Sequence, residues 1–386
     1  MNKYKAIVVG VDYHNELGLI RSLGIKGITP DVIVLGDTID GYVEHSKYTG
    51  NFIRCFSDED LLQSLSKYED FDGEIIVFTA GDVIAALLDS NRSRYSSKFH
   101  IPGCHGQLQC WLNKIDMCNQ AIKIGLNVPE FIVYKKGDNI PAEVPLPCIT
   151  KALSSIEGGK SDTIVCQSRE ELISFIKGNE NLCDVIQIER YIEKDIEFQL
   201  FGISLNDGEE IVIPGHSHIH RPGIQNEYYF PYIENDDSFT QTVSKAKDFI
   251  KSVKFSGTFS VEFIRDKNGL DYFLEMNFRN DGNAICVTDA GFNLPFIWFL
   301  YHAGLDYQAE LLTYRFTPVK FCPDVIYFYH MIGGELSFWE WAKTTFTSNS
   351  FIVYRKGDNK PFRKLVANQF KTMLKLCIKK ITNPFH

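Results

Sequence analysis

The fold prediction starts from one stretch of the 386-residue chain, Phe273-Leu274-Glu275-Met276-Asn277-Phe278-Arg279. Its first residues complete an apolar run, Asp271 to Met276, that is typical of a strand. Because side chains alternate along a strand, Glu275, Asn277 and Arg279 share one face. The stretch therefore predicts a strand that presents two oxygen donors and one cation on the same side.

The predicted strand before it, Gly257 to Ile264, adds Glu262 to the same region. Carboxylate and amide oxygens are the ligands that Mg²⁺ prefers, so Glu262, Glu275 and Asn277 form a candidate cation site. Arg279, just beyond them, can hold a phosphate or stabilise charge in a transition state. The alternative is a half-exposed strand whose polar residues face water.

The first hundred residues alternate between strands and helices. Strands are predicted at Ala6 to Val11, Val32 to Leu35 and Glu74 to Thr79, and the first and third lead into helical patterns. This alternation predicts a parallel sheet in a small open α/β domain.

The pattern changes near residue 112, where a predicted helix, Leu112 to Gly125, carries Lys114. Most of the strands predicted after it are neighbours in the sequence, at Phe131 to Tyr134, Cys148 to Ala152, Val185 to Glu189, Glu197 to Ile203 and Glu210 to Ile213. This second part is therefore predicted to be a mainly antiparallel α+β region.

A glycine-rich loop follows the predicted strand Cys148 to Ala152, and it reads Ile156-Glu157-Gly158-Gly159-Lys160-Ser161-Asp162. Adjacent glycines let backbone N–H groups approach phosphate oxygens closely. Lys151 before the loop and Lys160 within it would add positive charge. An ordinary hairpin turn is the alternative interpretation.

A third candidate segment is Gln187-Ile188-Glu189-Arg190-Tyr191-Ile192-Glu193. Where a strand passes into an extended segment, backbone N–H and C=O groups become available to the edge of an adenine ring. Glu189 could accept from the adenine amino group, and Glu197 could reach ribose hydroxyls. The alternative is a charged edge strand.

Taken in order, these segments resemble the motif set of the ATP-grasp superfamily over roughly residues 100 to 300. Members of that family close two α+β lobes on ATP beneath a mobile glycine-rich lid. The resemblance implies that the ATP-binding residues are Lys114, Lys151, Glu157, Gly158, Gly159, Lys160, Glu189, Arg190, Tyr191, Ile192 and Glu197, with adenine held through the backbone at Tyr191 and Ile192. It implies that Mg²⁺, or Mn²⁺ in its place, is bound by Glu262, Glu275 and Asn277, and that Arg279 is a catalytic contact to the transferred phosphate.

The same resemblance divides the chain into three parts. These are a pre-ATP-grasp α/β domain (1–111), an ATP-grasp domain (112–305) with a small lid lobe at about 148–192, and a C-terminal extension (306–386).

Two departures from the family pattern stand out. The loop has only two consecutive glycines, and Asn113 occupies a position where an acidic residue is common. Neither departure removes a phosphate ligand.

Within the superfamily the chain is similar to carboxylate–amine ligases, among them the D-aspartate ligase and carbamoyl-phosphate-synthase-like group. The similarity includes Gly10-Val11-Asp12 and the stretch Gly18 to Gly24. It implies a ligase that uses ATP to activate a small carboxylate as an acyl phosphate and joins it to an amine, in cell-wall, capsule or peptide biosynthesis. A thiol- or bicarbonate-using relative and a nucleotide-binding protein without turnover are the alternatives. Nicotinamide binding is disfavoured because G-x-G-x-x-G is absent.

Two further segments are candidates for substrate binding. In Pro214 to Arg221, a strand would place His216, His218 and His220 on one face, which we expect to look into the active site, and Arg221 could hold a substrate carboxylate or the terminal phosphate as a second catalytic residue. A zinc site and a solvated edge strand are the alternatives. After Arg279, the loop with Asp281 and Asn283 is placed to contact the acceptor amine.

The composition restricts the partners. The net charge of -9 disfavours nucleic-acid binding, which usually needs a basic face. No stretch approaches the roughly 18 apolar residues of a membrane span, and we expect a cytoplasmic enzyme whose relatives are often homodimers. The last residues form a basic amphipathic pattern, which predicts either a helix packed on the domain or peripheral contact with an anionic membrane.

One nine-residue pattern occurs twice. Residues 131–139 read Phe-Ile-Val-Tyr-Lys-Lys-Gly-Asp-Asn, and residues 351–359 read Phe-Ile-Val-Tyr-Arg-Lys-Gly-Asp-Asn. Each copy predicts a strand followed by a turn. The match ends after about a dozen residues, so it does not predict a duplicated domain.

Overall fold

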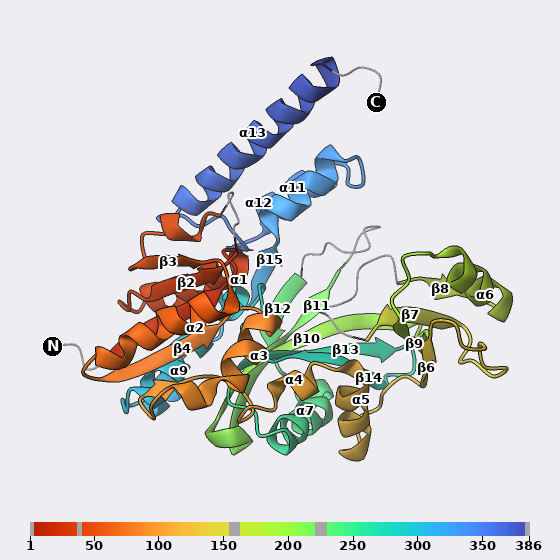
Figure 1. Cartoon of the computed structure of the whole chain (residues 1–386), viewed down its shortest axis with the longest axis horizontal. Coiled ribbons are helices and arrows are strands. Elements are labelled where there is room, and N and C mark those ends of the chain that lie inside the picture. Colours follow the sequence, from red (N-terminus) through yellow and green to blue (C-terminus); the bar gives the residue numbers. More distant parts are fainter. Residues whose placement is uncertain (1–3, 37–40, 154–162, 221–229, 383–386) are drawn as a thin grey trace.

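The computed structural model describes residues 4–36, 41–153, 163–220 and 230–382, with side chains up to Lys371. Figure 1 shows a body built on three sheets, with helix α13 projecting from it. The predicted combination of an N-terminal parallel sheet with a later α+β region is confirmed.

The first sheet is parallel throughout and has the strand order β3-β2-β1-β4-β5. Its strands are β1 (Tyr4–Gly10), β2 (Asp31–Leu35), β3 (Phe52–Cys55), β4 (Glu74–Thr79) and β5 (Phe99–His100). Its helices are α1 (His14–Gly24), α2 (Asp58–Ser66) and α3 (Asp82–Ser90). The strand order reverses between β1 and β4, and in open α/β sheets the carboxyl ends at such a point form a ligand crevice.

The second sheet has seven strands in the order β14-β13-β10-β11-β12-β15-β16. All its pairs are antiparallel except β15 with β16. The strands are β10 (Lys194–Leu205), β11 (Glu210–Ile219), β12 (Phe230–Glu234), β13 (Gly257–Asp266), β14 (Asp271–Asn277), β15 (Val319–Cys322) and β16 (Ser350–Phe351). The chain beyond residue 305 thus extends this sheet by two strands.

The third sheet is antiparallel, with the order β6-β9-β7-β8. Its elements are β6 (Phe131–Lys135), β7 (Cys148–Ala152), β8 (Val165–Cys166), β9 (Val185–Arg190) and helix α6 (Arg169–Gly178). A separate apolar cluster holds α6 to the sheet. Because β6 belongs to this sheet, the small lobe begins earlier in the chain than the range 148–192 expected from the sequence.

The remaining helices connect and cover these sheets. They are α4 (Leu108–Trp111), α5 (Lys114–Lys123), α7 (Thr240–Ser252), α8 (Ile285–Asp289), α9 (Leu294–His302), α10 (Gln308–Thr313), α11 (Asp324–Ile332), α12 (Phe338–Thr347) and α13 (Lys360–Thr382). One core joins the first sheet to the second through α1, α8 and α9. Trp298 of α9 lies in it, and its Nε1 donates to the Val77 carbonyl oxygen at 3.1 Å.

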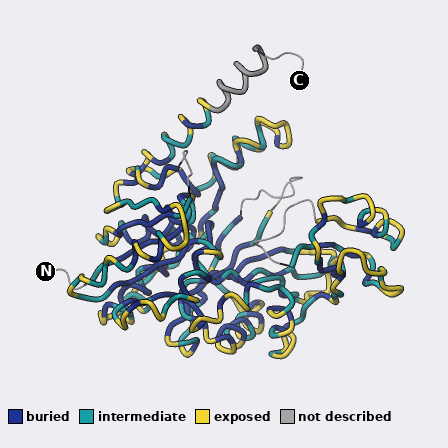
Figure 2. The backbone as a smooth tube through the Cα atoms, in the orientation of Figure 1, coloured by how far each residue is buried: buried dark blue, intermediate teal, exposed yellow. Residues whose placement is uncertain are grey.

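Figure 2 shows the buried residues concentrated in the strands where the first two sheets meet, and long exposed runs in the small lobe. Within the described ranges, every helix falls short of the length or the apolar character that crossing a bilayer requires.

A buried ion pair ties the end of the chain to its beginning. Arg21 Nε of α1 lies 2.9 Å from Asp358 Oδ2, and both side chains are nearly inaccessible to solvent. Arg21 Nη2 also donates to the Asp358 carbonyl oxygen, while Ser46 Oγ and the Lys47 N–H donate to the carboxylate. A carboxylate with this many donors holds a buried guanidinium firmly.

We predict that Asp358→Asn lowers the free energy of unfolding by about 3 kcal/mol, because Arg21 would stay buried without a counter-charge. Urea denaturation measures the change. The matched control is Glu209→Gln, which breaks the exposed Lys251–Glu209 ion pair and should cost no more than about 1 kcal/mol. Equal effects of the two variants would contradict this account of the buried pair.

Glu16 is a buried carboxylate at the start of α1. Its two oxygens accept from the backbone N–H groups of Val11 at 2.6 Å and Tyr13 at 2.8 Å. Burial raises the pKa of Glu16 from 4.5 to about 7, although these backbone donors oppose the shift. The folded chain therefore binds more protons than the unfolded chain between those two pH values.

Stability contributed by this protonation is present at low pH and is lost as the pH rises toward 7. We predict that the free energy of unfolding falls by roughly 2 kcal/mol between pH 5 and 7 through Glu16 alone. The measurement is the difference between the pH profiles of wild type and Glu16→Gln, since the variant should lack this slope. Parallel profiles would show that Glu16 titrates alike in both states.

Candidate active site

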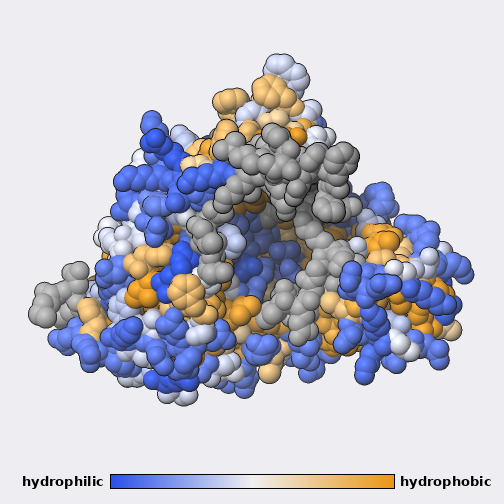
Figure 3. Space-filling view, turned by 45° about the horizontal axis from the view of Figure 1, so that its top comes forward, coloured by the Kyte–Doolittle hydropathy of each residue, from blue (hydrophilic) through white to orange (hydrophobic). Residues whose placement is uncertain are grey.

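A cavity of about 210 Å³ lies between the second and third sheets. It is lined by Lys114, Lys151, Gln187, Glu189, Glu197, Glu262, Leu274 and Glu275. Six of these eight residues were predicted from the sequence, and only Gln187 and Leu274 were not. Figure 3 shows a molecular face that is hollowed at its centre, with hydrophilic atoms visible inside the hollow.

The candidate cation ligands are neighbours on one face of the second sheet. Glu262 of β13 pairs in register with Glu275 of β14, and Ser260 pairs with Asn277. Asn277 Nδ2 lies 3.2 Å from Ser260 Oγ and 3.5 Å from Glu262 Oε1. Lys114 Nζ lies 3.6 Å from Glu275 Oε2. The alternation of side chains along the two strands thus brings the predicted residues together.

This donor set fits a hard divalent cation. Two carboxylates on adjacent strands repel each other unless a cation lies between them, and oxygen ligands suit Mg²⁺ and Mn²⁺. In the described part of the chain, no three His, Cys, Asp or Glu side chains converge as a metal site. A cation bound here would therefore take further ligands from the Asn277 amide, water or a bound phosphate.

Gln199 is a buried residue of this face that the sequence analysis missed. Its Nε2 lies 3.1 Å from Ser260 Oγ, 3.2 Å from Asp281 Oδ2 and 3.4 Å from Glu262 Oε1. It follows Glu197 by two positions on β10, so the period of two along a strand could have found it. The amide links the cation face to the loop after β14.

Arg279 bridges the second sheet and the first. Its Nη1 lies 3.2 Å from Asp281 Oδ2, and its Nε lies 3.4 Å from Asp82 Oδ1 at the start of α3. Its Nη2 donates to Asn277 Oδ1 at 3.1 Å. Burial by itself lowers the pKa of Arg279, but the nearby carboxylates of Asp82, Asp281 and Glu275 outweigh it, so the pKa rises and the charge is secure.

The loop after β14 contacts the chain at the carboxyl ends of β1 and β4. The Asn280 N–H donates to the Thr79 carbonyl oxygen at 3.1 Å, and Asn280 Nδ2 donates to the Asn15 carbonyl oxygen at 3.2 Å. A Cβ at Gly282 would lie 2.6 Å from His14 Cδ2 and 2.6 Å from Asn15 Oδ1, so only glycine permits this approach. Burial lowers the pKa of His14 to about 4, which keeps the imidazole neutral at physiological pH.

On the side of the cavity formed by β7, β9 and β10, the charged side chains form ion pairs with one another. Lys151 Nζ lies 2.8 Å from Glu189 Oε1, and Gln187 Nε2 donates to Glu189 Oε2 at 3.1 Å. Lys194 Nζ lies 2.6 Å from Glu197 Oε2. Lys151, Gln187 and Glu189 share a face because β7 pairs with β9 in register.

Lys114 is the first residue of α5, and Asn113 is its N-cap. Asn113 Oδ1 accepts from the backbone N–H groups of Ile115 at 2.9 Å and Asp116 at 3.4 Å. An asparagine caps a helix as well as an aspartate does, which explains the departure noted at this position.

The Tyr191 backbone and the Arg190 side chain both make contacts that differ from the expected nucleotide contacts. The Tyr191 N–H donates to the Pro147 carbonyl oxygen at 2.7 Å, so it is already engaged. Arg190 points away from the cavity, where its Nη2 lies 2.6 Å from Glu130 Oε2 and its Nη1 donates to the Leu146 carbonyl oxygen. The Arg190 side chain is therefore part of the lobe's structure. Ile192 lies between β9 and β10, and its backbone contact with adenine stays a prediction.

The expectation that His216 and His218 face the active site is wrong. Gln199 pairs with Ser217 across β10 and β11, so Ser217 shares the cavity's face and its two histidine neighbours turn to the opposite face. There the ring of His216 stacks on Phe239 with centroids 3.7 Å apart. His220 is exposed at the end of β11.

The other substrate candidates lie in the loop after β14. Asp281 is buried and accepts from Arg279, Gln199 and Ser260, and also from the Asn283 N–H at 2.8 Å. Its role as a contact to the amine remains a prediction. Some predicted residues fall outside the described ranges, namely Glu157, Gly158, Gly159, Lys160 and Arg221.

Comparison with known proteins identifies the domain. Residues 119–280 match the family model of the ATP-grasp domain. A formate-dependent phosphoribosylglycinamide formyltransferase from Bacteroides thetaiotaomicron is 25% identical over 179 residues, which make up 44% of this chain and 45% of that protein. The match thus spans less than half the length of this curated relative.

Two solved structures share the fold. An L-amino acid ligase from Bacillus licheniformis superposes with a TM-score of 0.64 and 13% identity, over 83% of this chain and 80% of the ligase. An N5-carboxyaminoimidazole synthetase from Staphylococcus aureus, complexed with ADP, superposes with a TM-score of 0.63 and 19% identity, over 79% of this chain and 80% of the synthetase. The chain therefore contains a segment, residues 119–280, that matches the ATP-grasp domain, and Lys151, Glu262 and Glu275 of the cavity lie within it.

Proposed function

We propose that this protein is an ATP- and magnesium-dependent ligase that activates a carboxylate as an acyl phosphate and joins it to an amine. The observation that carries the proposal is the convergence of Glu262, Glu275, Lys114 and Lys151 on one cavity, with Arg279 beside it. A degenerate nucleotide-binding protein has no reason to keep this set complete. The proposal therefore favours turnover over binding alone.

Charge balance supports a metal–nucleotide ligand. Four glutamates and two lysines line the cavity, so a polyphosphate would be repelled unless cations accompanied it. Glu262, Glu275 and Asn277 would hold the Mg²⁺, or Mn²⁺ in its place. A bound cation of this kind neutralises charge on the phosphoryl group during transfer.

The lysines would bind the phosphates. Lys114 extends from the first turn of α5 toward Glu275, and Lys151 ends β7. For Lys151 to engage a phosphate it must leave Glu189, which would free that carboxylate to accept from the adenine amino group. Glu197, on the same face of the strand as Gln199, would accept from the ribose hydroxyls.

Arg279 would orient the reacting groups. A substrate carboxylate oxygen attacks the γ-phosphorus of ATP, the bond from phosphorus to the bridging oxygen of ADP breaks, and an acyl phosphate forms. The amine then attacks the acyl carbon, loses a proton, and inorganic phosphate leaves. Because Asp82 and Asp281 fix the guanidinium, it would stabilise negative charge in both steps without reorganising.

The substrates would enter at the carboxyl ends of β1 and β4, where a strand-order reversal creates a crevice. His14 and Asn15 border this place, directly across from Gly282. The same proposal divides the chain into domains 1–111, 112–305 and 306–386. In it, the first domain supplies the side of the substrate crevice that contains His14 and Asn15. A cytoplasmic location and a homodimer remain proposals, and light scattering of the purified chain tests the latter.

The experiment is to measure ADP and phosphate release with magnesium–ATP across pools of amino acids and small carboxylates. We expect release to require one acid and one amine, and hydroxylamine in place of the amine should trap the acyl phosphate as a hydroxamate. Release with bicarbonate alone would identify a bicarbonate-activating enzyme instead. Tight nucleotide binding with no release in any pool would contradict the proposal for small substrates.

A further inference from the structure

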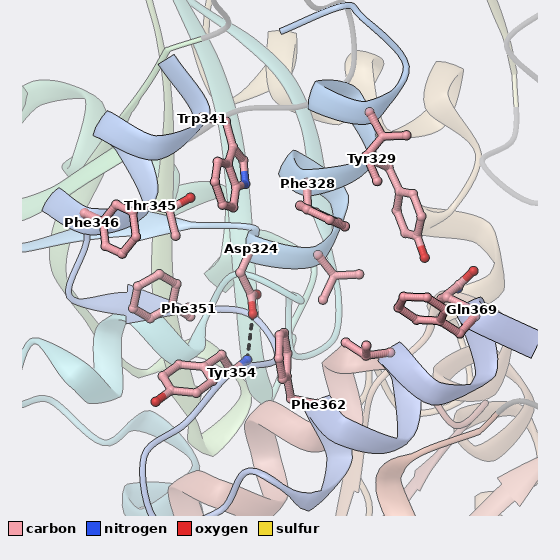
Figure 4. Close-up of a pocket in the computed structure, with 14 residues that line it drawn as sticks. Asp324, Phe328, Tyr329, Trp341, Thr345, Phe346, Phe351, Tyr354, Phe362 and Gln369 are labelled. Carbon is pink, nitrogen blue, oxygen red and sulfur yellow. Dashed lines mark hydrogen bonds between the residues drawn. The ribbon is translucent and has the colours of Figure 1, made fainter. Parts of the chain in front are cut away.

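An aromatic groove of about 600 Å³ lies in the C-terminal part of the chain, away from the residues of the active-site cavity. Helices α11, α12 and α13 and strand β16 form its walls. Figure 4 shows Phe328, Trp341, Phe351 and Phe362 pointing into it, and Asp324 at its base. The Asp324 carboxylate accepts from the N–H groups of Val353 and Tyr354, so it does not need a ligand.

Several large apolar side chains around this groove are exposed to solvent. Phe346 is 82% exposed, Trp339 79% and Phe370 71%. A water-soluble surface rarely leaves several such residues together without a partner. Phe362 and Leu365 of α13 pack on the main core, whereas Phe370 is exposed, so the apolar stripe of the helix is only partly covered among the side chains that the structure describes.

The sequence from residue 338 onward has a net charge opposite in sign to that of the whole chain. Residues 338–386 contain ten Lys and Arg but only two acidic residues, within a chain whose net charge is -9. One of those acids, Asp358, is buried against Arg21. Helix α13 contains no acidic residue along its 23 positions. Lys343 on α12 and Lys360 and Lys371 on α13 are exposed, and the same two helices carry aromatic residues of the groove.

We propose that the face formed by this groove and its exposed aromatic residues binds the surface of an anionic membrane, with lipid acyl chains entering the groove. Exposed aromatic side chains beside lysines are the combination that partitions into the headgroup region of a bilayer. Helix α13 projects from the body in Figure 1, and its sequence contains seven Lys and Arg residues. A second copy of the chain is a poor occupant, because pairing the two faces would bring two cationic helices together.

The inference is independent of the proposed reaction, because none of its residues lines the active-site cavity. Its test is flotation of the full chain with vesicles of phosphatidylcholine alone and of equal parts phosphatidylcholine and phosphatidylglycerol. We expect binding to the anionic vesicles only, weakened by added salt. Each lysine near such a surface is worth about fivefold in partitioning, and each Lys→Glu change also adds a negative charge, so Lys343→Glu/Lys371→Glu should weaken binding by at least about 30-fold.

The aromatic pair is tested by Phe346→Ser/Phe370→Ser, which should lower partitioning by at least about tenfold. The matched controls are Phe56→Ser, at a Phe that is 71% exposed in the N-terminal domain, and Lys123→Glu/Lys135→Glu, and both should bind like wild type. Urea unfolding verifies that all variants fold. Equal binding to neutral vesicles, no binding to either vesicle, or unaffected binding by both test variants overturns the proposal. A loss of dimers on Phe346→Ser/Phe370→Ser would also overturn it, and would assign the face to a second copy.

Discussion

Glu275→Gln should reduce ADP release by about 1,000-fold under saturating acid and amine. The substitution keeps the size of the side chain but removes the charge that Glu262 and Glu275 together offer a cation, and that partners Lys114 at 3.6 Å. A loss of this size corresponds to about 4 kcal/mol of transition-state stabilisation. The measurement is the initial rate of ADP formation over a range of magnesium concentrations.

Raising the magnesium concentration should restore part of the lost rate, because the weakened site would fill again. The control is Glu209→Gln, an exposed glutamate that pairs with Lys251, and neither residue lines the cavity. A loss of less than tenfold in Glu275→Gln, or no dependence on magnesium, would contradict the assignment of a cation to this face.

Arg279→Met should lower turnover by a similar factor and also destabilise the fold. The guanidinium is the shared counter-charge of Asp82 and Asp281, so its removal leaves the buried Asp281 and the partly buried Asp82 without it. We expect the free energy of unfolding to fall by about 3 kcal/mol. Initial rates and urea denaturation measure the two effects separately.

A second substitution separates catalysis from folding. In Arg279→Met/Asp82→Asn one of the unpaired charges is also removed, so part of the lost stability should return. Turnover should stay low, because the donor to the transferred phosphate is still missing. Recovery of turnover along with stability would mean that Arg279 acts only by holding the two sheets together.

The repeated pattern at residues 131–139 and 351–359 shows how far local sequence determines structure. Both copies form the same turn, in which the N–H of Asp138 or Asp358 donates to the carbonyl oxygen three residues earlier and the glycine before it has a positive φ. The strands differ, since β6 has five residues and β16 has two. The turn follows from Gly-Asp-Asn, whereas strand length depends on the neighbouring strands that the rest of the chain supplies.

The residues of the active site could be predicted from the sequence where the alternation of side chains along a strand determines which face they occupy. Glu262, Glu275 and Asn277 follow from period two within a hairpin of adjacent strands, and Gln199 could have been found in the same way. Asp82 could not, because its contact with Arg279 joins positions 197 residues apart, one at the start of α3 and the other just after β14. The direction of His216 depended on the register of β10 with β11, which composition and spacing alone do not determine.

The ion pair between Arg21 and Asp358 has a consequence for how this protein can be recombined. Because the last turn before α13 neutralises a cation in the first helix, the C-terminal part is not an exchangeable module. If a chimera took this segment from a homologue without an acidic residue at this position, Arg21 would be buried in it without a counter-charge. The segments that carry Arg21 and Asp358 should therefore be inherited together, and a substitution at either residue should be tolerated only alongside a compensating change at the other.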